Sequence, residues 1–183
     1  MIIEDFFEHP TAVREVLLAQ EMMDYKASDD VVYPGIVALP RSLEEEVENN
    51  LNFLFQGRLE KAQSFARFSL QDMKPPHWAH SDFNMCDFVC LVYLSPVDEK
   101  SDGTHLVKHR ATGMEVHPQN DSEMDILLSQ ANQKINWEIT FTCPSRFNRA
   151  FIINSHYLHA AATRFGKTKL DSRLVLTCFF NLN

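Results

Sequence analysis

The sequence predicts one α+β domain in which β-strands form a sandwich or barrel and the helices come first. Three observations lead to this expectation. Helical patterns are confined to the first third of the chain, strand-like runs dominate the rest, and 14 phenylalanines in 183 residues suit a packed β-rich interior. At this length one domain is the default, and we expect it to span residues 1–183, with a helical part over 1–66 and a β-rich core over 67–183.

Two amphipathic helices are expected in the helical part. Pro10 suits a first helical position, and apolar residues follow it at helical spacing. Tyr-Pro-Gly at 33–35 has the composition of a turn. The sequence Ser-Leu-Glu-Glu at 42–45 is a capping box, which predicts a second helix that ends near Gly57 or continues toward Phe65.

Strand signals follow from residue 68 onward. The run at 87–94, Asp-Phe-Val-Cys-Leu-Val-Tyr-Leu, is almost continuously apolar and predicts a strand buried on both faces. Between the later strands, residues 120–133 suggest a short helix or surface segment, part of an insertion near 112–134. The predicted strands lie at 68–71, 87–94, 104–110, 135–142, 149–153 and 173–180.

The bulk composition excludes several classes of function. A net charge of −8 disfavours binding to nucleic acid or anionic membranes. No apolar run approaches the roughly 20 residues of a membrane span, and the N-terminus carries acids where a signal peptide has cations. We therefore expect a cytoplasmic protein with no nucleic-acid or membrane partner. The sequence does not predict its oligomeric state. Its cysteines are expected to be reduced and structural: Cys86, Cys90, Cys143 and Cys178.

The most informative pattern is His80-Ser81-Asp82, followed much later by His159. Alternate residues of an extended segment share a face, so His80 and Asp82 can point at one ion. The third ligand must come from a distant segment. Two imidazoles and one carboxylate on one face of Fe(II) form the facial triad of non-haem oxygenases, which leaves coordination positions open. The sequence thus predicts an iron site.

Other histidines compete with this assignment. His156 lies three residues before His159 and is the alternative third ligand, although the small residues at 160–162 favour His159 by leaving room near an ion. His77 is expected at the edge of a pocket. The remaining candidates are expected at the surface or supporting the ligands: His105, His109 and His117.

Arg173 opens an otherwise apolar strand and is the candidate for binding an anion. Its planar guanidinium matches a carboxylate in a bidentate manner. An internal ion pair and an exposed strand start are the alternatives. Thr177 lies four residues later on the same strand face, and Tyr93 lies on another strand; both are candidates for the same carboxylate, with Tyr93 equally suited to the core. Arg149, at a further strand start, fits a structural role better than a substrate contact.

Beyond these residues, the chain resembles the 2-oxoglutarate- and Fe(II)-dependent oxygenase superfamily. The order of His80, Asp82, His159 and Arg173 carries the resemblance. Several segments are more narrowly similar to a prolyl-hydroxylase-like branch of bacteria and their phages, namely IIEDFFEHPTAVREVLL, YPGIVALP, PHWAHSDFN, DGTHLVKHRATG and FNRAFIINSHYLHA. Ser155 stands where many members have glycine.

The resemblance implies a double-stranded β-helix, the jelly-roll of cupin-like proteins, over 67–183 with the N-terminal helices packed on it. It implies His80, Asp82 and His159 as the catalytic iron ligands, and Arg173 as the residue that binds 2-oxoglutarate. The expected activity is a hydroxylase-type dioxygenase that uses Fe(II), 2-oxoglutarate and O₂, releases succinate and CO₂, and acts on a small-molecule or peptidyl substrate.

Two other classes of function remain open. One is a non-catalytic cupin-like protein that binds a metal or small molecule. The other is a metal-dependent cupin enzyme that does not use 2-oxoglutarate, which an arginine on a late strand disfavours.

Overall fold

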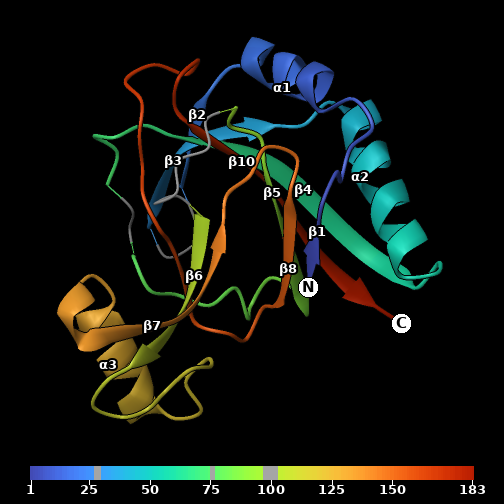
Figure 1. Cartoon of the computed structure of the whole chain (residues 1–183). Coiled ribbons are helices and arrows are strands. Elements are labelled where there is room, and N and C mark those ends of the chain that lie inside the picture. The colour runs from blue at the N-terminus through green and yellow to red at the C-terminus, as the bar shows by residue number, and fades with distance from the viewer. Residues whose placement is uncertain (27–29, 75–76, 97–102) are drawn as a thin grey trace.

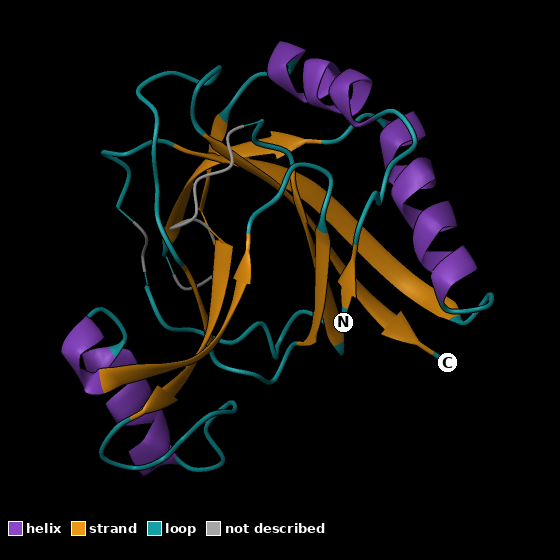
Figure 2. Cartoon of the chain, in the orientation of Figure 1, coloured by secondary structure: helices purple, strands orange, loops and turns teal. Residues whose placement is uncertain are grey.

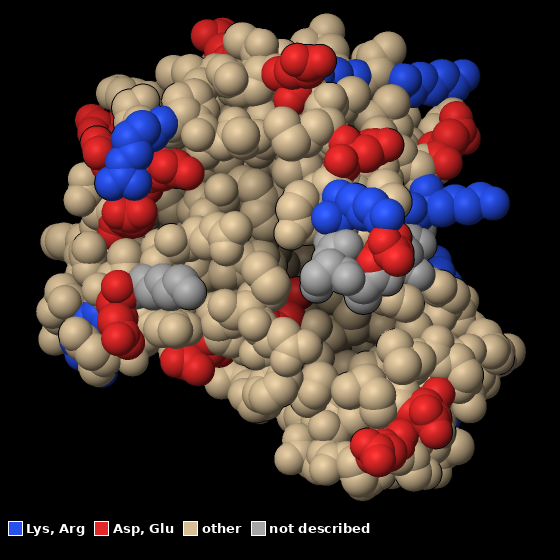
Figure 3. Space-filling view, turned by 180° about the vertical axis from the view of Figure 1, so that it is seen from behind, with Lys and Arg blue, Asp and Glu red and all other residues tan. Residues whose placement is uncertain are grey.

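Two antiparallel sheets face each other, and helices cover their outer sides (Figures 1 and 2). The computed structural model describes residues 1–26, 30–74, 77–96 and 103–183. Within these residues no helix is long and apolar enough to cross a membrane. Viewed from behind, the surface is hollowed near its centre and carries acidic and basic side chains in scattered groups (Figure 3).

The larger sheet has seven strands and provides most of the core. Its central strand is β10, whose first eight residues are all buried because both faces of the sheet are covered. The predicted apolar run at 87–94 is its neighbour β5. In spatial order the strands are β1 (Ile2–Ile3), β8 (Ala150–Asn154), β5 (Phe88–Tyr93), β10 (Arg173–Leu182), β4 (Leu59–Ser69), β3 (Val32–Ala38) and β2 (Met23–Lys26).

The smaller sheet has three strands, in the order β7, β6 and β9. Their bounds are Gly103–His109 for β6, Trp137–Pro144 for β7 and His159–Ala161 for β9, with a 3-10 turn at Lys134–Asn136 before β7. An isolated antiparallel bridge joins His80 to His159 at the free side of β9. This bridge brings two segments that are distant in the sequence to the same edge.

Helices α1 (Pro10–Ala19) and α2 (Arg41–Leu54) cover the outer face of the larger sheet (Figure 1). Leu17 and Leu51 are fully buried there, against one set of alternating residues of β5 and β10. Burying each such leucine contributes about 1.5–3 kcal/mol. The outer face of the smaller sheet is covered by α3 (Asp121–Gln130), whose Leu127 packs near Trp137.

A third apolar cluster fills the space between the two sheets. It contains the other set of alternating residues, including Val89, Tyr93, Val175 and Phe179 from the larger sheet and Cys143 from the smaller one. The larger sheet therefore has two different faces. One packs on helices, and the other lines the interior where polar groups can gather.

The expectation that residues 1–66 are helical is wrong in part. The two predicted helices exist, and the first begins at Pro10 as expected. However, β2 and β3 lie between the two helices, and β4 begins at Leu59 after α2, so the second helix does not continue toward Phe65. Pairing of β4 with both β3 and β10 outweighs the local helical pattern in this region.

Two local predictions in this region are also wrong. Residues 33–35 lie within β3 and not in a turn: Gly35 has φ +78°, and a Cβ there would lie 2.1 Å from the carbonyl oxygen of Phe68. The glycine permits close approach of β3 to β4. The capping box does not form, because α2 starts one residue earlier at Arg41 after Pro40, whose carbonyl accepts bonds from Leu43 and Glu44.

Candidate metal centre

His80, Asp82 and His159 meet at the edge of the smaller sheet. Their candidate ligand atoms all lie within 4.8 Å of one another. The His80 and His159 ring centroids are 4.4 Å apart, and His159 Nε2 lies 3.3 Å from Asp82 Oδ2. Backbone bonds in both directions between His80 and His159 hold the two segments together at 3.0 and 2.8 Å. The arrangement provides two imidazoles and one carboxylate at one point.

Both imidazole rings are oriented by the main chain. His80 Nδ1 lies 3.3 Å from the carbonyl oxygen of Trp78, and His159 Nδ1 lies 3.0 Å from that of Tyr157. A carbonyl can only accept, so each Nδ1 carries the proton and each Nε2 has its lone pair available. This second hydrogen bond is the usual way in which a protein fixes the tautomer of a metal-binding histidine.

The electrostatics of the three groups favour a bound cation. Burial lowers the pKa of His80 to about 4, with a further contribution from His159, so this ring is neutral near pH 7. Burial alone would raise the pKa of Asp82, but His159 and His80 lower it overall, so the carboxylate is ionised. Burial opposes the charged form of His159, yet Asp82 raises its pKa overall. A metal ion would replace the proton that His159 and Asp82 share.

Ser155 holds Asp82 in place, a role that the sequence did not reveal. Its side chain is fully buried, and its carbonyl accepts a 3.0 Å bond from the Asp82 amide. Its hydroxyl donates to the carbonyl of Cys86, and its amide donates to that of Asp87 at 2.9 Å. Ser155 thus ties the segment after Asp82 to the segment before His159. In the sequence, Ser155 was noted only because many members of the oxygenase superfamily have glycine at this position.

His156, the alternative ligand, lies outside the cluster. Its ring packs edge-on against Phe83, with ring centroids 4.5 Å apart. His117 stacks on the same phenylalanine, with ring centroids 4.2 Å apart. His117 Nδ1 in turn lies 2.8 Å from the hydroxyl of Ser81. The residues beside Asp82 are therefore held by a small aromatic group that includes His156. The structure brings His159, and not His156, together with His80 and Asp82.

His109 has a structural role in the smaller sheet. His109 is 2% exposed, so the surface position, one of the two alternatives expected for it, is wrong. Its two ring nitrogens lie 2.9 Å from Thr112 Oγ1 and 3.1 Å from Gln130 Oε1, and its ring contacts Trp137. This ring joins α3 to the smaller sheet because both of its polar atoms find partners there.

Arg173, Tyr93 and Thr177 lie on the interior face of the larger sheet. Arg173 and Thr177 have the same parity on β10 as Val175, which packs in the interior cluster directly opposite Tyr93. Arg173 is 7% exposed and donates to the carbonyl of Gly103 at 3.1 Å, and its guanidinium carbon lies 6.0 Å from the centre of the Tyr93 ring. The structure excludes the exposed strand start as an explanation for Arg173.

Tyr93 and Arg149 have structural partners. The Tyr93 hydroxyl lies 2.9 Å from Thr104 Oγ1, and burial raises its pKa. Arg149 pairs with Glu4 at 2.7 Å and donates to the carbonyl of Pro144 at 2.8 Å. Arg149 therefore ties β8 to the N-terminal segment, in keeping with the structural interpretation.

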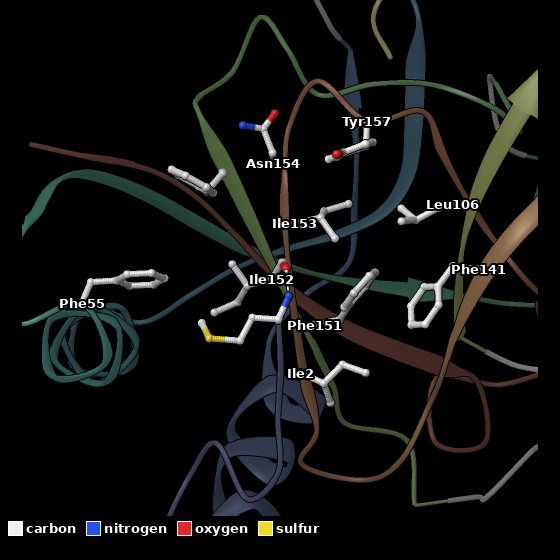
Figure 4. A pocket seen from close by; sticks show the side chains of 11 residues that line it. Ile2, Phe55, Leu106, Phe141, Phe151, Ile152, Ile153, Asn154 and Tyr157 are labelled. Atoms are coloured by element: carbon white, nitrogen blue, oxygen red, sulfur yellow. Dashed lines mark hydrogen bonds between the residues drawn. The ribbon is translucent and has the colours of Figure 1, made fainter. Parts of the chain in front are cut away.

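An apolar hollow of about 660 Å³ opens beside β8, between the two sheets (Figure 4). Phe151 and Phe141 pack against each other in its wall, with ring centroids 5.8 Å apart. It lies near the triad, because Leu106 is the strand partner of His159 and Tyr157 provides the carbonyl bound by His159 Nδ1. Its side chains offer no charged group.

The comparisons with known proteins place the chain in a family. Residues 1–180 match the model of DUF6445, described as a family of unknown function. The chain belongs to the DUF6445 family. No curated protein matches the sequence of this family member.

Solved structures of low sequence identity share the fold of this DUF6445 protein. A prolyl hydroxylase in complex with a hypoxia inducible factor peptide fragment, from Trichoplax adhaerens, matches with TM-score 0.60 and 12% identity over 98% of this chain and 82% of that one. HygX from Streptomyces hygroscopicus with nickel and 2-oxoglutarate matches with TM-score 0.57 and 14% identity, covering 97% and 80%.

A third match is the non-haem α-ketoglutarate-dependent epimerase SnoN from nogalamycin biosynthesis, with TM-score 0.57 and 14% identity over 97% of this chain and 76% of that one. SnoN is α-ketoglutarate-dependent and HygX was solved with 2-oxoglutarate, while one neighbour is an epimerase and another a prolyl hydroxylase. The shared property is the mainly-β fold with large antiparallel sheets.

Proposed function

We propose that this DUF6445 protein is a non-haem Fe(II)- and 2-oxoglutarate-dependent oxygenase that hydroxylates a small-molecule or peptidyl substrate. The convergence of His80, Asp82 and His159, with their ligand atoms within 4.8 Å of one another, carries the proposal. The oxygenase fold of the structural neighbours supports it.

The residues present fit the metal. Two imidazoles, whose Nε2 atoms can bind a metal once His159 gives up the proton it shares with Asp82, and one carboxylate form a 2-His-1-carboxylate set that leaves positions open, as Fe(II) oxygenases require. When bound, Fe(II) with 2-oxoglutarate supplies the chemistry that activates O₂ and releases succinate and CO₂. The protein contributes fixed ligands, a buried setting and orientation of the co-substrate.

We assign the far carboxylate of 2-oxoglutarate to Arg173. The guanidinium is buried on the interior face of β10, where it donates to the carbonyl of Gly103. Thr177 lies on the same face and Tyr93 opposite Val175, so both can adjoin that carboxylate. A planar guanidinium held on the interior face has the geometry for a bidentate contact with a carboxylate, which supports this assignment.

We assign the two facing sheets to a double-stranded β-helix in a single domain. The central strands of the larger sheet, β8-β5-β10-β4, face the smaller sheet, in which the His80 bridge adds a fourth segment beside β9, β6 and β7. Two facing layers of four extended segments each are the arrangement of a jelly-roll, and they support this assignment. The metal ligands then lie at its open edge.

Thermal unfolding under argon tests this function. We expect Mn(II) to raise the unfolding midpoint, and 2-oxoglutarate to raise it further only when Mn(II) is present, since the keto acid needs the metal. Arg173→Gln should lose most of the second rise and retain the first. The control is Arg149→Gln, which removes another strand-start arginine and should keep both rises.

Two outcomes contradict the proposal. A midpoint that 2-oxoglutarate leaves unchanged in the Mn(II)-loaded wild type would favour a cupin-like protein that binds a metal without this co-substrate. Equal 2-oxoglutarate responses of wild type and Arg173→Gln would remove Arg173 from the site.

A further inference from the structure

Arg67 lies on the interior face of the larger sheet, in the layer that contains Arg173. Residues directly opposite each other in a sheet share a face. Arg67 is opposite Val175 of β10 and Ile36 of β3, and Val175 is in turn opposite Tyr93. Val175 and Tyr93 belong to the interior cluster, so the Arg67 side chain points into the space between the sheets.

The Arg67 guanidinium is buried with one group unsatisfied. Its Nε donates to the carbonyl of Pro34 at 3.1 Å, whereas its Nη2 is inaccessible to solvent and has no hydrogen-bond partner. Among the residues that the structure describes, no carboxylate forms an ion pair with Arg67. A buried N–H without an acceptor costs about 1–3 kcal/mol, more when the group is charged. An ordinary structural arginine would not leave this group unpaired.

Two further arginines lie in this region: Arg173 shares the face of the neighbouring strand, and Arg164 donates to Met73, whose side chain lies beside Gly35. Burial lowers the pKa of Arg67 to about 10, with further contributions from the positive charges of Arg164 and Arg173. The pKa of Arg164 is likewise lowered by burial and then by Arg173. Several cationic groups therefore lie near one another on this side of the interior.

The co-substrate does not balance this charge. In the proposed function, 2-oxoglutarate places one carboxylate at the metal and the other at Arg173. Arg67 and Arg164 then have no described carboxylate as a partner, and Arg164 uses Nη1 to donate to the carbonyl of Met73. The buried Nη2 of Arg67 is therefore available to a second anion.

We propose that Arg67, with Arg164 beside it, binds a carboxylate of the substrate, so that the substrate is an anionic, carboxylate-bearing compound. This inference rests on the proposed function for the identity of the other ligand. The same chemistry would suit the metal-proximal carboxylate of 2-oxoglutarate, and the experiment separates these two sources.

The test uses acetate as the probe, with acetamide as its neutral counterpart, in thermal unfolding of the full chain at constant ionic strength. We expect acetate, and not acetamide, to raise the wild-type midpoint by about 2–4 °C at saturation. Arg67→Met should lose this response. It should also unfold at the wild-type temperature or above when ligand-free, because an uncompensated buried cation has been replaced by an apolar chain of similar length.

Arg14 provides the matched control. It is also buried, but its Nη1 and Nη2 donate to the carbonyls of Leu94 and Leu170. Arg14→Met should therefore lower the ligand-free midpoint and keep the acetate response. A wild type that does not respond to acetate would overturn the inference. So would an Arg67→Met variant that loses stability as Arg14→Met does and still responds.

A second arm distinguishes the two sources of carboxylate. With saturating Mn(II) and 2-oxoglutarate, acetate should still raise the wild-type midpoint if the site belongs to the substrate. If the acetate response disappears under these conditions and Arg67→Met weakens 2-oxoglutarate binding, the carboxylate is that of the co-substrate and the substrate assignment is wrong. An acetate response without any effect of Mn(II) and 2-oxoglutarate would instead refute the proposed function.

Discussion

The orientation of single atoms decides what the triad can do. His80 and His159 each direct Nδ1 at a main-chain carbonyl two residues earlier, at Trp78 and Tyr157. The same local geometry therefore occurs twice and leaves both Nε2 atoms facing Asp82. Spacing in the sequence predicted which residue types meet, but the tautomer depends on backbone positions that only the fold provides.

Ser155 gives a prediction at this scale. Ser155→Ala removes the buried bond to the carbonyl of Cys86 and leaves that oxygen unsatisfied, so the free energy of unfolding should fall by about 1–3 kcal/mol. The main-chain bond from the Asp82 amide to the Ser155 carbonyl remains in this variant, but the hydroxyl no longer anchors that main chain to Cys86, so metal affinity should fall as well. Urea unfolding and Mn(II) titration measure the two effects.

Ser129 serves as the control for that variant. Its hydroxyl donates to the carbonyl of Asp125 at 2.6 Å on the exposed side of α3. Ser129→Ala should change the free energy of unfolding by no more than about 0.5 kcal/mol. Equal effects of the two substitutions would show that the Ser155 hydroxyl does not support the site.

At the scale of elements, the register of β3, β4 and β10 positions the cationic groups. Gly35 permits β3 to approach β4 closely, and Arg67 and Arg173 then lie on the same face of neighbouring strands. The second helix ends close to Gly57, one of the two predicted ends, and the alternative continuation toward Phe65 is wrong because β4 has strand partners on both sides. Local periodicity contains no information about such partners, whereas the long apolar run of β5 needed none to be recognised.

Two glycines with the same backbone conformation test this packing. Gly35 has φ +78° and Gly57 φ +79°, but a Cβ at Gly35 would meet the carbonyl of Phe68 at 2.1 Å and one at Gly57 would meet nothing within 4 Å. Gly57→Ala should cost about 1 kcal/mol of unfolding free energy for the backbone conformation alone. Gly35→Ala should cost clearly more, as measured by urea unfolding.

The difference between these two variants isolates the contact between β3 and β4. Similar losses in both would mean that β3 can move away from β4 without penalty. In that case the position of Arg67 would not depend on the close approach at Gly35.

For the whole molecule, the sequence predicted the chemistry of the site better than its surroundings. The order of His80, Asp82, His159 and Arg173 is visible in the chain because each residue type is unusual in its place. Arg67 was not singled out, since its meaning depends on an interior face shared with Arg173. Ser155 was similarly inconspicuous, because its role is to hold two distant segments together.

The central claim is that one metal ion is held by His80, Asp82 and His159, and calorimetric titration with Mn(II) tests it most directly. The account predicts one ion per chain for the wild type and for His156→Ala. His80→Ala, Asp82→Ala and His159→Ala should weaken binding by more than about 100-fold, beyond the usual effect of losing a supporting residue. Wild-type affinity in Asp82→Ala, or loss of binding in His156→Ala with His159→Ala unaffected, would contradict it.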